Sequence, residues 1–244
     1  MRYLLYPLLA LCLLAGGTTL TQAEDSAAPG IAFHVLRVIY PAGEKQGVAL
    51  TAYNKSPVPY LMQSRMRPVD PATGDVDLNG QGTPAVPFIV TPPLARLEAN
   101  GELTLRIRRN DMPLPNDRES VFFISMKALP TQQPGSEQMV MTVVSNLKLF
   151  YRPNGLAKRA VADMAPKLTF SQEGHQLTAH NPTPYWLTFS RLAVGGVALD
   201  KPALRRMVPP FGRQSYALPA AASGKVTWQL IDEDGWDTPV AQQP

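Results

Sequence analysis

The chain contains the stretch Met139-Val-Met-Thr-Val-Val-Ser-Asn-Leu-Lys148, which continues as Leu149-Phe-Tyr-Arg-Pro153. This apolar, β-branched and methionine-rich run predicts one long β-strand. Side chains alternate between the two faces of a strand. One face therefore carries Met139, Met141 and Val143, and the other carries Val140, Thr142 and Val144. A strand that is apolar on both faces either lies inside a sheet or needs a partner to cover it.

The N-terminus has the features of a secretory signal peptide. Arg2 supplies a positive start, an apolar run from Leu4 to Gly16 follows, and small residues precede Glu24. This pattern predicts a cleaved segment at residues 1–23, because the run is too short and too soon interrupted to span a membrane. The alternative is a membrane anchor that stays attached. No second apolar run reaches membrane-spanning length, so we expect no membrane insertion of the mature chain.

The composition is that of an exported protein that folds without disulfides. The only cysteine, Cys12, lies in the predicted signal segment. The roughly 220 residues that remain are enough for one large or two ordinary domains. Loss of Arg2 lowers the formal net charge from +4 to +3, and the chain has no polybasic run, which argues against nucleic-acid binding.

Short strands between turns are predicted, because 25 prolines spread along the chain disfavour long helices. Seven candidate strands come first: 33–40, 47–54, 60–66, 86–91, 103–109, 120–127 and 139–151. Six more follow: 167–171, 176–180, 186–194, 204–208, 214–218 and 226–231. The break falls near Arg152-Pro-Asn-Gly155. We therefore expect an all-β protein with two immunoglobulin-like β-sandwich domains, at residues 24–152 and 153–244.

Catalytic and metal-binding patterns are missing from the sequence. His34, His175 and His180 lie far apart, and a mature chain without cysteine has neither a thiol nucleophile nor a Cys-based zinc site. There is no Gly-x-Ser-x-Gly elbow, no Gly-rich phosphate loop and no His-Glu-x-x-His motif. We therefore expect no catalytic residue, no cofactor and no metal.

Five motifs that occur in order along the chain together resemble one protein family. They are Arg37-Val-Ile-Tyr-Pro-Ala-Gly43, Val90-Thr-Pro-Pro93, Leu114-Pro-Asn-Asp-Arg-Glu-Ser-Val-Phe-Phe123, Leu147-Lys-Leu-Phe-Tyr-Arg-Pro153 and Asn181-Pro-Thr-Pro-Tyr185. The chain closely resembles the PapD/FimC-like periplasmic chaperones of the chaperone–usher pilus pathway, from about Phe33 to Trp236. The resemblance implies two immunoglobulin-like domains arranged as a boomerang with a cleft between them.

The resemblance also implies a site for the C-terminal carboxylate of an unfolded pilus subunit. By motif, its two cations are Arg37 and Lys148. A carboxylate between two partly desolvated cations makes charge-assisted hydrogen bonds, and the guanidinium fork fixes its orientation. The alternative is that both residues are ordinary exposed strand charges.

In this family the chaperone lends a strand to a subunit whose sandwich lacks one. The resemblance assigns that role to Met139, Met141 and Val143, while we assign Val140, Thr142 and Val144 to the protein's own core. The alternative for the first row is also the protein's own core. Strict alternation places Lys148 on the face opposite the first row, so the strand must twist or bulge near 145–147, or the lysine must act beyond the sheet's edge.

Two further segments are interpreted as structural. Arg106, Glu119 and Glu233 match a family salt-bridge network between the domains. Residues 66–87 form a longer segment than the family has, rich in Asp, Gly and Pro, which predicts a solvent-exposed loop.

These observations predict a non-enzymatic chaperone of the periplasm. It would capture pilus subunits, complete their fold by strand addition and hand them to an outer-membrane usher. Its exposed apolar edge also predicts that the free protein self-associates through residues 139–143. The alternative is a two-domain adhesin or structural module, in which these residues are covered and Arg37 and Lys148 lie apart. A carbohydrate-active enzyme is a third alternative, and it requires a carboxylate pair that the sequence does not reveal.

Overall fold

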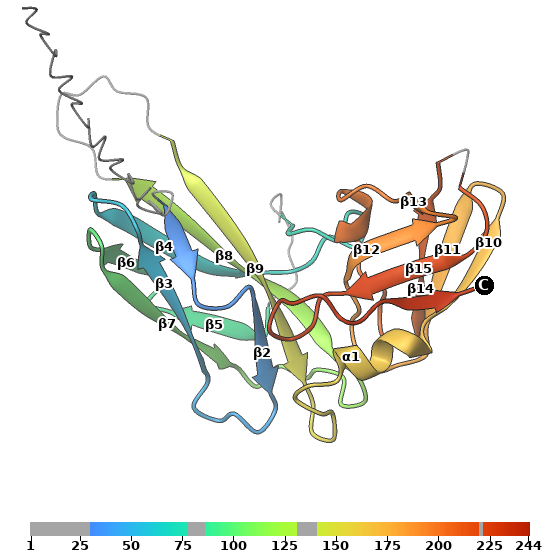
Figure 1. Ribbon diagram of the computed structural model, residues 1–244. Helices are drawn as coiled ribbons and strands as arrows, with labels where there is room; N and C mark the ends of the chain where they lie inside the picture. Colours follow the sequence, from blue (N-terminus) through green and yellow to red (C-terminus); the bar gives the residue numbers. More distant parts are fainter. Residues whose placement is uncertain (1–29, 78–85, 131–140, 220–221) are drawn as a thin grey trace, which may run out of the picture.

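The protein consists of two β-sandwich domains arranged as the arms of a boomerang (Figure 1). The computed structural model describes residues 30–77, 86–130, 141–219 and 222–244. Each domain has its own hydrophobic core, one built from residues between Val38 and Tyr151 and the other from residues between Ala160 and Leu230. The predicted signal segment, Met139 and Val140 lie outside the described residues.

The N-terminal domain is a sandwich of two mostly antiparallel sheets. Its strands are β1 (Ile31–Phe33), β2 (Arg37–Pro41), β3 (Val48–Asn54), β4 (Tyr60–Arg67), β5 (Phe88–Thr91), β6 (Leu94–Leu97), β7 (Glu102–Arg109), β8 (Ser120–Pro130) and β9 (Val143–Arg152). The sheets have the orders β1-β3-β7-β5 and β2-β9-β8-β4-β6. The single strand predicted at 33–40 is two strands, because the chain crosses from one sheet to the other between β1 and β2.

The C-terminal domain is a second sandwich. Its elements are α1 (Val161–Met164), η1 (Ala165–Lys167), β10 (Thr169–Glu173), β11 (Gln176–Asn181), β12 (Phe189–Val194), β13 (Val197–Ala198), η2 (Ala203–Arg205), β14 (Gly212–Ala217), β15 (Val226–Leu230) and β16 (Ala241–Gln243). The sheets have the orders β10-β11-β14 and β13-β12-β15-β16. The strand predicted at 204–208 is wrong, because Pro202 adopts a helical conformation and starts the 3₁₀ turn η2, from which Leu204 enters the core.

Strand β9 has two halves with different neighbours. Along its whole length it pairs with β8, in an unbroken register from Val143 opposite Ala128 to Tyr151 opposite Ser120. On its other side β2 runs parallel to it, but only from Lys148 to Arg152. Among the described residues, the half from Val143 to Leu147 therefore has a free edge.

The two faces of β9 differ from the prediction. Leu147, Leu149 and Tyr151 belong to the core of the N-terminal domain, so Val143 lies on this core face. Val144 shares the opposite face with Lys148 and is 48% exposed, so its assignment to the core is wrong. No bulge interrupts the pairing with β8, and Lys148 lies on the opposite face through plain alternation.

That opposite face is where the second domain docks. Val121 and Phe150 project from β8 and β9 and pack against Met207 of the C-terminal domain. Trp186 and Val69 cover the edges of this small interdomain cluster. Val69 belongs to the segment 66–87, so the prediction of a solvent-exposed loop is wrong for its first part, while 78–85 lie outside the described residues.

Candidate functional site

Arg37 and Lys148 are direct neighbours on adjacent parallel strands. They are register partners at the point where β2 begins to pair with β9. Neighbouring strands lie about 4.8 Å apart, so the two side chains leave the same face of the sheet close together. This face is the one that carries the interdomain cluster.

The Arg37 guanidinium is buried and held in place by the second domain. Its Nη1 donates a hydrogen bond to the carbonyl oxygen of Ile231 at 2.8 Å, and its Cζ lies 5.1 Å from the centroid of the Phe150 ring. Burial lowers the pKa of Arg37 to about 10, and nearby carboxylates, chiefly that of Glu119, oppose this. The guanidinium therefore stays charged and has a fixed orientation.

Lys148 is a half-buried ammonium group without a partner in the part of the chain that the structure describes: it has neither a hydrogen bond nor an ion pair there. Burial, together with the positive charge of Arg37, lowers its pKa to about 8, although the carboxylate of Asp75 opposes both effects. Two adjacent, poorly solvated cations repel each other, so this arrangement is suited to binding an anion.

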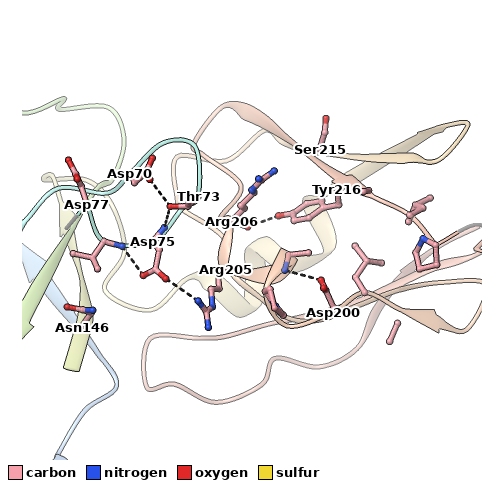
Figure 2. Close-up of a pocket in the computed structure, with 18 residues that line it drawn as sticks. Asp70, Thr73, Asp75, Asp77, Asn146, Asp200, Arg205, Arg206, Ser215 and Tyr216 are labelled. Atoms are coloured by element: carbon pink, nitrogen blue, oxygen red, sulfur yellow. Dashed lines mark hydrogen bonds and ion pairs between the residues drawn. The ribbon is translucent and has the colours of Figure 1, made fainter. Parts of the chain in front are cut away.

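An open cleft of about 1010 Å³ lies between the domains, and Asn146 is the residue of β9 that lines it. The N-terminal domain contributes Asn146 and residues of the segment from Asp70 to Asp77, and the C-terminal domain contributes residues 198–200, 202–203, 205–206 and 215–219 (Figure 2). Asn146 stands two residues before Lys148 on the same face of β9. The cleft therefore reaches the outer face of β9 at Asn146.

A buried ion-pair network ties the domains together at the far end of β9. Its centre is Arg152, whose Nε lies 2.5 Å from Oε1 of Glu119 and whose Nη2 lies 2.7 Å from Oε1 of Glu233. Glu119 also accepts a hydrogen bond from the Trp186 N–H at 2.7 Å. Burial disfavours the Arg152 charge, but the two carboxylates raise its pKa above the ordinary value.

The structure places Glu119 and Glu233 in this network, and Arg106 lies outside it. Arg106 lies on β7, in the other sheet of the N-terminal domain, and its guanidinium donates to the carbonyl oxygen of Gly47 at 3.1 Å. Arg152 takes the role that the prediction gave to Arg106. The sequence held a signal for this, because Arg152 follows Lys148 by four residues and so lies on the same face of the strand.

Of the proposed donor residues, Val143 is the first residue of β9 at its free edge, and Met141 precedes the strand by two residues. Met141 is 78% exposed and Val143 is 45% exposed. Met139 lies outside the described residues. The adhesin alternative required a covered strand and a separated Arg37 and Lys148, and the structure shows neither.

Comparison with known families covers both domains. Residues 30–157 match the model described as "Pili and flagellar-assembly chaperone, PapD N-terminal domain", and residues 163–242 match "Pili assembly chaperone PapD, C-terminal domain". The chain belongs to the PapD family of periplasmic pilus-assembly chaperones. This family is non-enzymatic.

Individual PapD-family proteins are similar over nearly their full length. "Chaperone protein FimC" of Escherichia coli K12 is 35% identical over 234 residues, which cover 93% of this chain and 90% of FimC. The SafB chaperone, solved in complex with the Salmonella enterica SafA pilin, superposes with a TM-score of 0.74 at 30% identity, over 88% of this chain and 96% of that one. The E. coli chaperone DraB gives a TM-score of 0.72 at 33% identity, over 88% and 98%.

Two further findings concern the described residues of this PapD-family chain. None of the helices there is long and apolar enough to cross a membrane. The same residues hold no group of three His, Cys, Asp or Glu side chains that is suited to a metal ion.

Replacing Arg152 by methionine should lower the free energy of unfolding by about 3–5 kcal/mol, because it leaves two buried carboxylates without their cation. Urea unfolding followed by tryptophan fluorescence measures this. The matched control is Asp234→Asn, which removes the neighbouring exposed ion pair with Arg159 and should cost less than about 1 kcal/mol. Equal losses in the two variants would contradict the role of Arg152.

Proposed function

We propose that the protein captures a pilus subunit by adding a subunit strand to the free edge of β9, and that Arg37 and Lys148 bind the carboxylate at the end of that strand. One observation carries this proposal: the free edge of β9 stops where β2 begins, at the register pair of the two cations. The edge and the anion site therefore meet at one point.

This geometry also sets the direction of the added strand. A strand that pairs with Val143–Leu147 would lie in line with β2, whose first residue is Arg37. If it runs parallel to β9, its carboxyl end abuts Arg37 and Lys148. If it runs antiparallel, its positively charged amino end abuts Arg37 and Lys148, and the two cations would repel that end. The charges therefore favour the parallel direction.

The carboxylate anchor fixes the register of the client. Hydrogen bonds to charged groups contribute about 1.5–3 kcal/mol each, and a shift by one residue would lose them. The same shift would exchange the two faces of the client strand. Anchor and edge together thus select one alignment of the client on β9.

The apolar row beside the anchor would supply part of the client's core. Val143 continues the face on which Leu147 and Leu149 build the core of the N-terminal domain, and Met141 extends this row in sequence. An open subunit sandwich docked on this edge would share one continuous core with the chaperone. Each side chain that becomes fully buried contributes about 1.5–3 kcal/mol, and methionine adapts to irregular pockets.

The solved SafB relative, in complex with the SafA pilin, supports carrying over the class of client. The client here is a pilus subunit, and the partner that receives it is an outer-membrane usher, as is the family's role. Without a client, the free edge would pair with a second copy of the chain, because exposed edges recruit other strands.

Lys148→Ala and Arg37→Ala should each abolish the complex with a co-expressed cognate subunit, because one cation alone does not hold the desolvated carboxylate. Co-purification measures the yield of complex, and thermal unfolding checks that each variant is folded. Lys127→Ala, which removes an exposed lysine of β8 on the same sheet, is the control and should leave the yield unchanged. Normal yields of complex with both variants would contradict carboxylate binding by Arg37 and Lys148.

Affinity for a peptide that ends in a free carboxylate should fall as the pH rises above about 8, where Lys148 loses its charge. The fall should reach at most about tenfold per pH unit. Isothermal titration calorimetry across pH 6–9, below the pKa of about 10 of Arg37, measures it. Lys148→Arg should remove this dependence, because a guanidinium stays charged throughout that range. An amidated peptide should bind weakly at every pH, and a pH response with it would point to another group.

Val143→Asp should prevent complex formation, whereas Val144→Asp should retain at least half of the normal yield of complex. The two valines are adjacent and equally exposed, at 45% and 48%, but they lie on opposite faces of β9. Only Val143 shares the face of the core residues, so only its replacement buries a carboxylate in the joint core. The opposite ranking in a co-purification assay would show that the faces are reversed.

A further inference from the structure

The connection from β4 to β5 begins with a segment that crosses to the second domain. We call residues 68–77 the strap. Val69 and Val76 form an isolated antiparallel bridge, so the segment folds back on itself as a tight turn. It lines the interdomain cleft opposite residues of the C-terminal domain (Figure 2).

The strap is held in one shape by its own hydrogen bonds. The Asp70 carboxylate accepts from the Ala72 N–H at 2.8 Å and from Oγ1 of Thr73 at 3.0 Å. These bonds lower the pKa of Asp70. The Gly74 N–H donates to the carbonyl oxygen of Asp70 at 2.8 Å, which closes the turn. Hydrogen bonds within the segment therefore support the shape of the strap.

Three different contacts join the strap to the C-terminal domain. Val69 packs into the interdomain cluster beside Met207. Oδ2 of Asp75 lies 3.3 Å from Nη1 of Arg205, in an exposed ion pair (Figure 2). At Gly74 the backbones come so close that a Cβ atom would lie 2.8 Å from Cα of Arg206.

Gly74 shows how closely the two domains fit here. Its φ of +71° is a conformation that residues with a side chain rarely adopt, and the neighbouring backbone leaves no room for one. The contact is thus built from backbone against backbone, which cannot yield as a flexible side chain does.

The strap and the Arg152 network hold the domains at two separate places along β9. Asn146 faces the cleft that the strap lines, and Arg152 lies six residues further on. Lys148 lies between these two residues of β9. The strap also reaches toward Arg152, because Val69 packs on the cluster that contains Phe150. Its contacts through Gly74 and Asp75, with Arg206 and Arg205, are the ones separate from the network. A single attachment point permits a hinge motion, whereas two separated points oppose it.

We propose that the strap is a second interdomain tether, which fixes how the C-terminal domain sits on the outer face of β9 and so positions the anion site at Arg37 and Lys148 for its ligand. The tether itself does not depend on the proposed function, whereas its effect on carboxylate binding does. A loosened strap would let the second domain swing about the Arg152 network and would move Ile231 with it. Arg37, which is held by the Ile231 carbonyl, would then lose its fixed place beside Lys148.

Gly74→Val tests the tether, because its side chain collides with Arg206. The control is Gly174→Val, at a glycine that also has a positive φ, of +54°, but has nothing within 4 Å of its Cβ position. The chain has no cysteine beyond Cys12, so spin labels can be placed at Glu102→Cys and Lys225→Cys, one exposed site in each domain. Double electron–electron resonance then reports the distance between the domains.

The distance distribution should broaden or shift in Gly74→Val and stay as in the parent protein in Gly174→Val. Val69→Ala, which removes only the apolar contact and strains nothing, should change it in the same direction. An unchanged distribution in both Gly74→Val and Val69→Ala would overturn the tether.

Binding of a free-carboxylate peptide completes the test. If the competent arrangement falls to about one tenth of the population, the affinity of Gly74→Val should fall about tenfold. A looser distance distribution with unchanged affinity would overturn the positioning role. If Lys148→Ala does not lower the affinity for the same peptide, the proposed function would be overturned. The distance result would remain valid in that case.

Discussion

The structure depends on an incomplete strand pairing. Strand β9 is bonded on one side along its whole length, but on the other side only from Lys148 onward. The second half, from Lys148 to Arg152, pairs with a strand on each side, so it is fixed inside the sheet. The first half, from Val143 to Leu147, pairs on one side only. Its free backbone groups and exposed apolar side chains can pair with another strand.

Burial gives the boundary between these halves the properties of the proposed anion site. The C-terminal domain packs on the outer face of β9 through Phe150 and Met207, and this packing removes water from Arg37 and Lys148. The same face carries Arg152, which is fully neutralised by two acids, whereas Lys148 has no acid bonded to it among the described residues. Arg152 is therefore a structural cation, whereas Lys148 remains available to a ligand.

Much of this was predictable from residue patterns, and the exceptions have physical reasons. The apolar run at 139–151, the proline-rich punctuation and the five motifs indicated two sandwiches, the edge strand and the pair Arg37 and Lys148. The face of Val144 was missed because alternation gives two rows but not which one meets the core; only the burial of Leu147 and Leu149 decides that.

Arg106 was predicted in place of Arg152 because a motif aligns a charged residue in sequence. The partner of that charge depends on the sheet in which the residue lies, which the motif does not give. The strap was read as exposed because Asp, Gly and Pro are equally suited to a free loop and to a turn that fits a neighbouring backbone.

The alternation along β9 separates two kinds of recognition on a single strand. In the proposed complex, Val143 and Met141 face a client's interior, while Lys148, on the opposite face from Val143, binds a terminal carboxylate that every polypeptide has. Substitutions in the apolar row can therefore retune which client fits, and the general anchor stays untouched. A new chaperone–client pair can arise from changes at alternate positions only, so a duplicated copy of such a gene could acquire a different client without passing through a form that binds none.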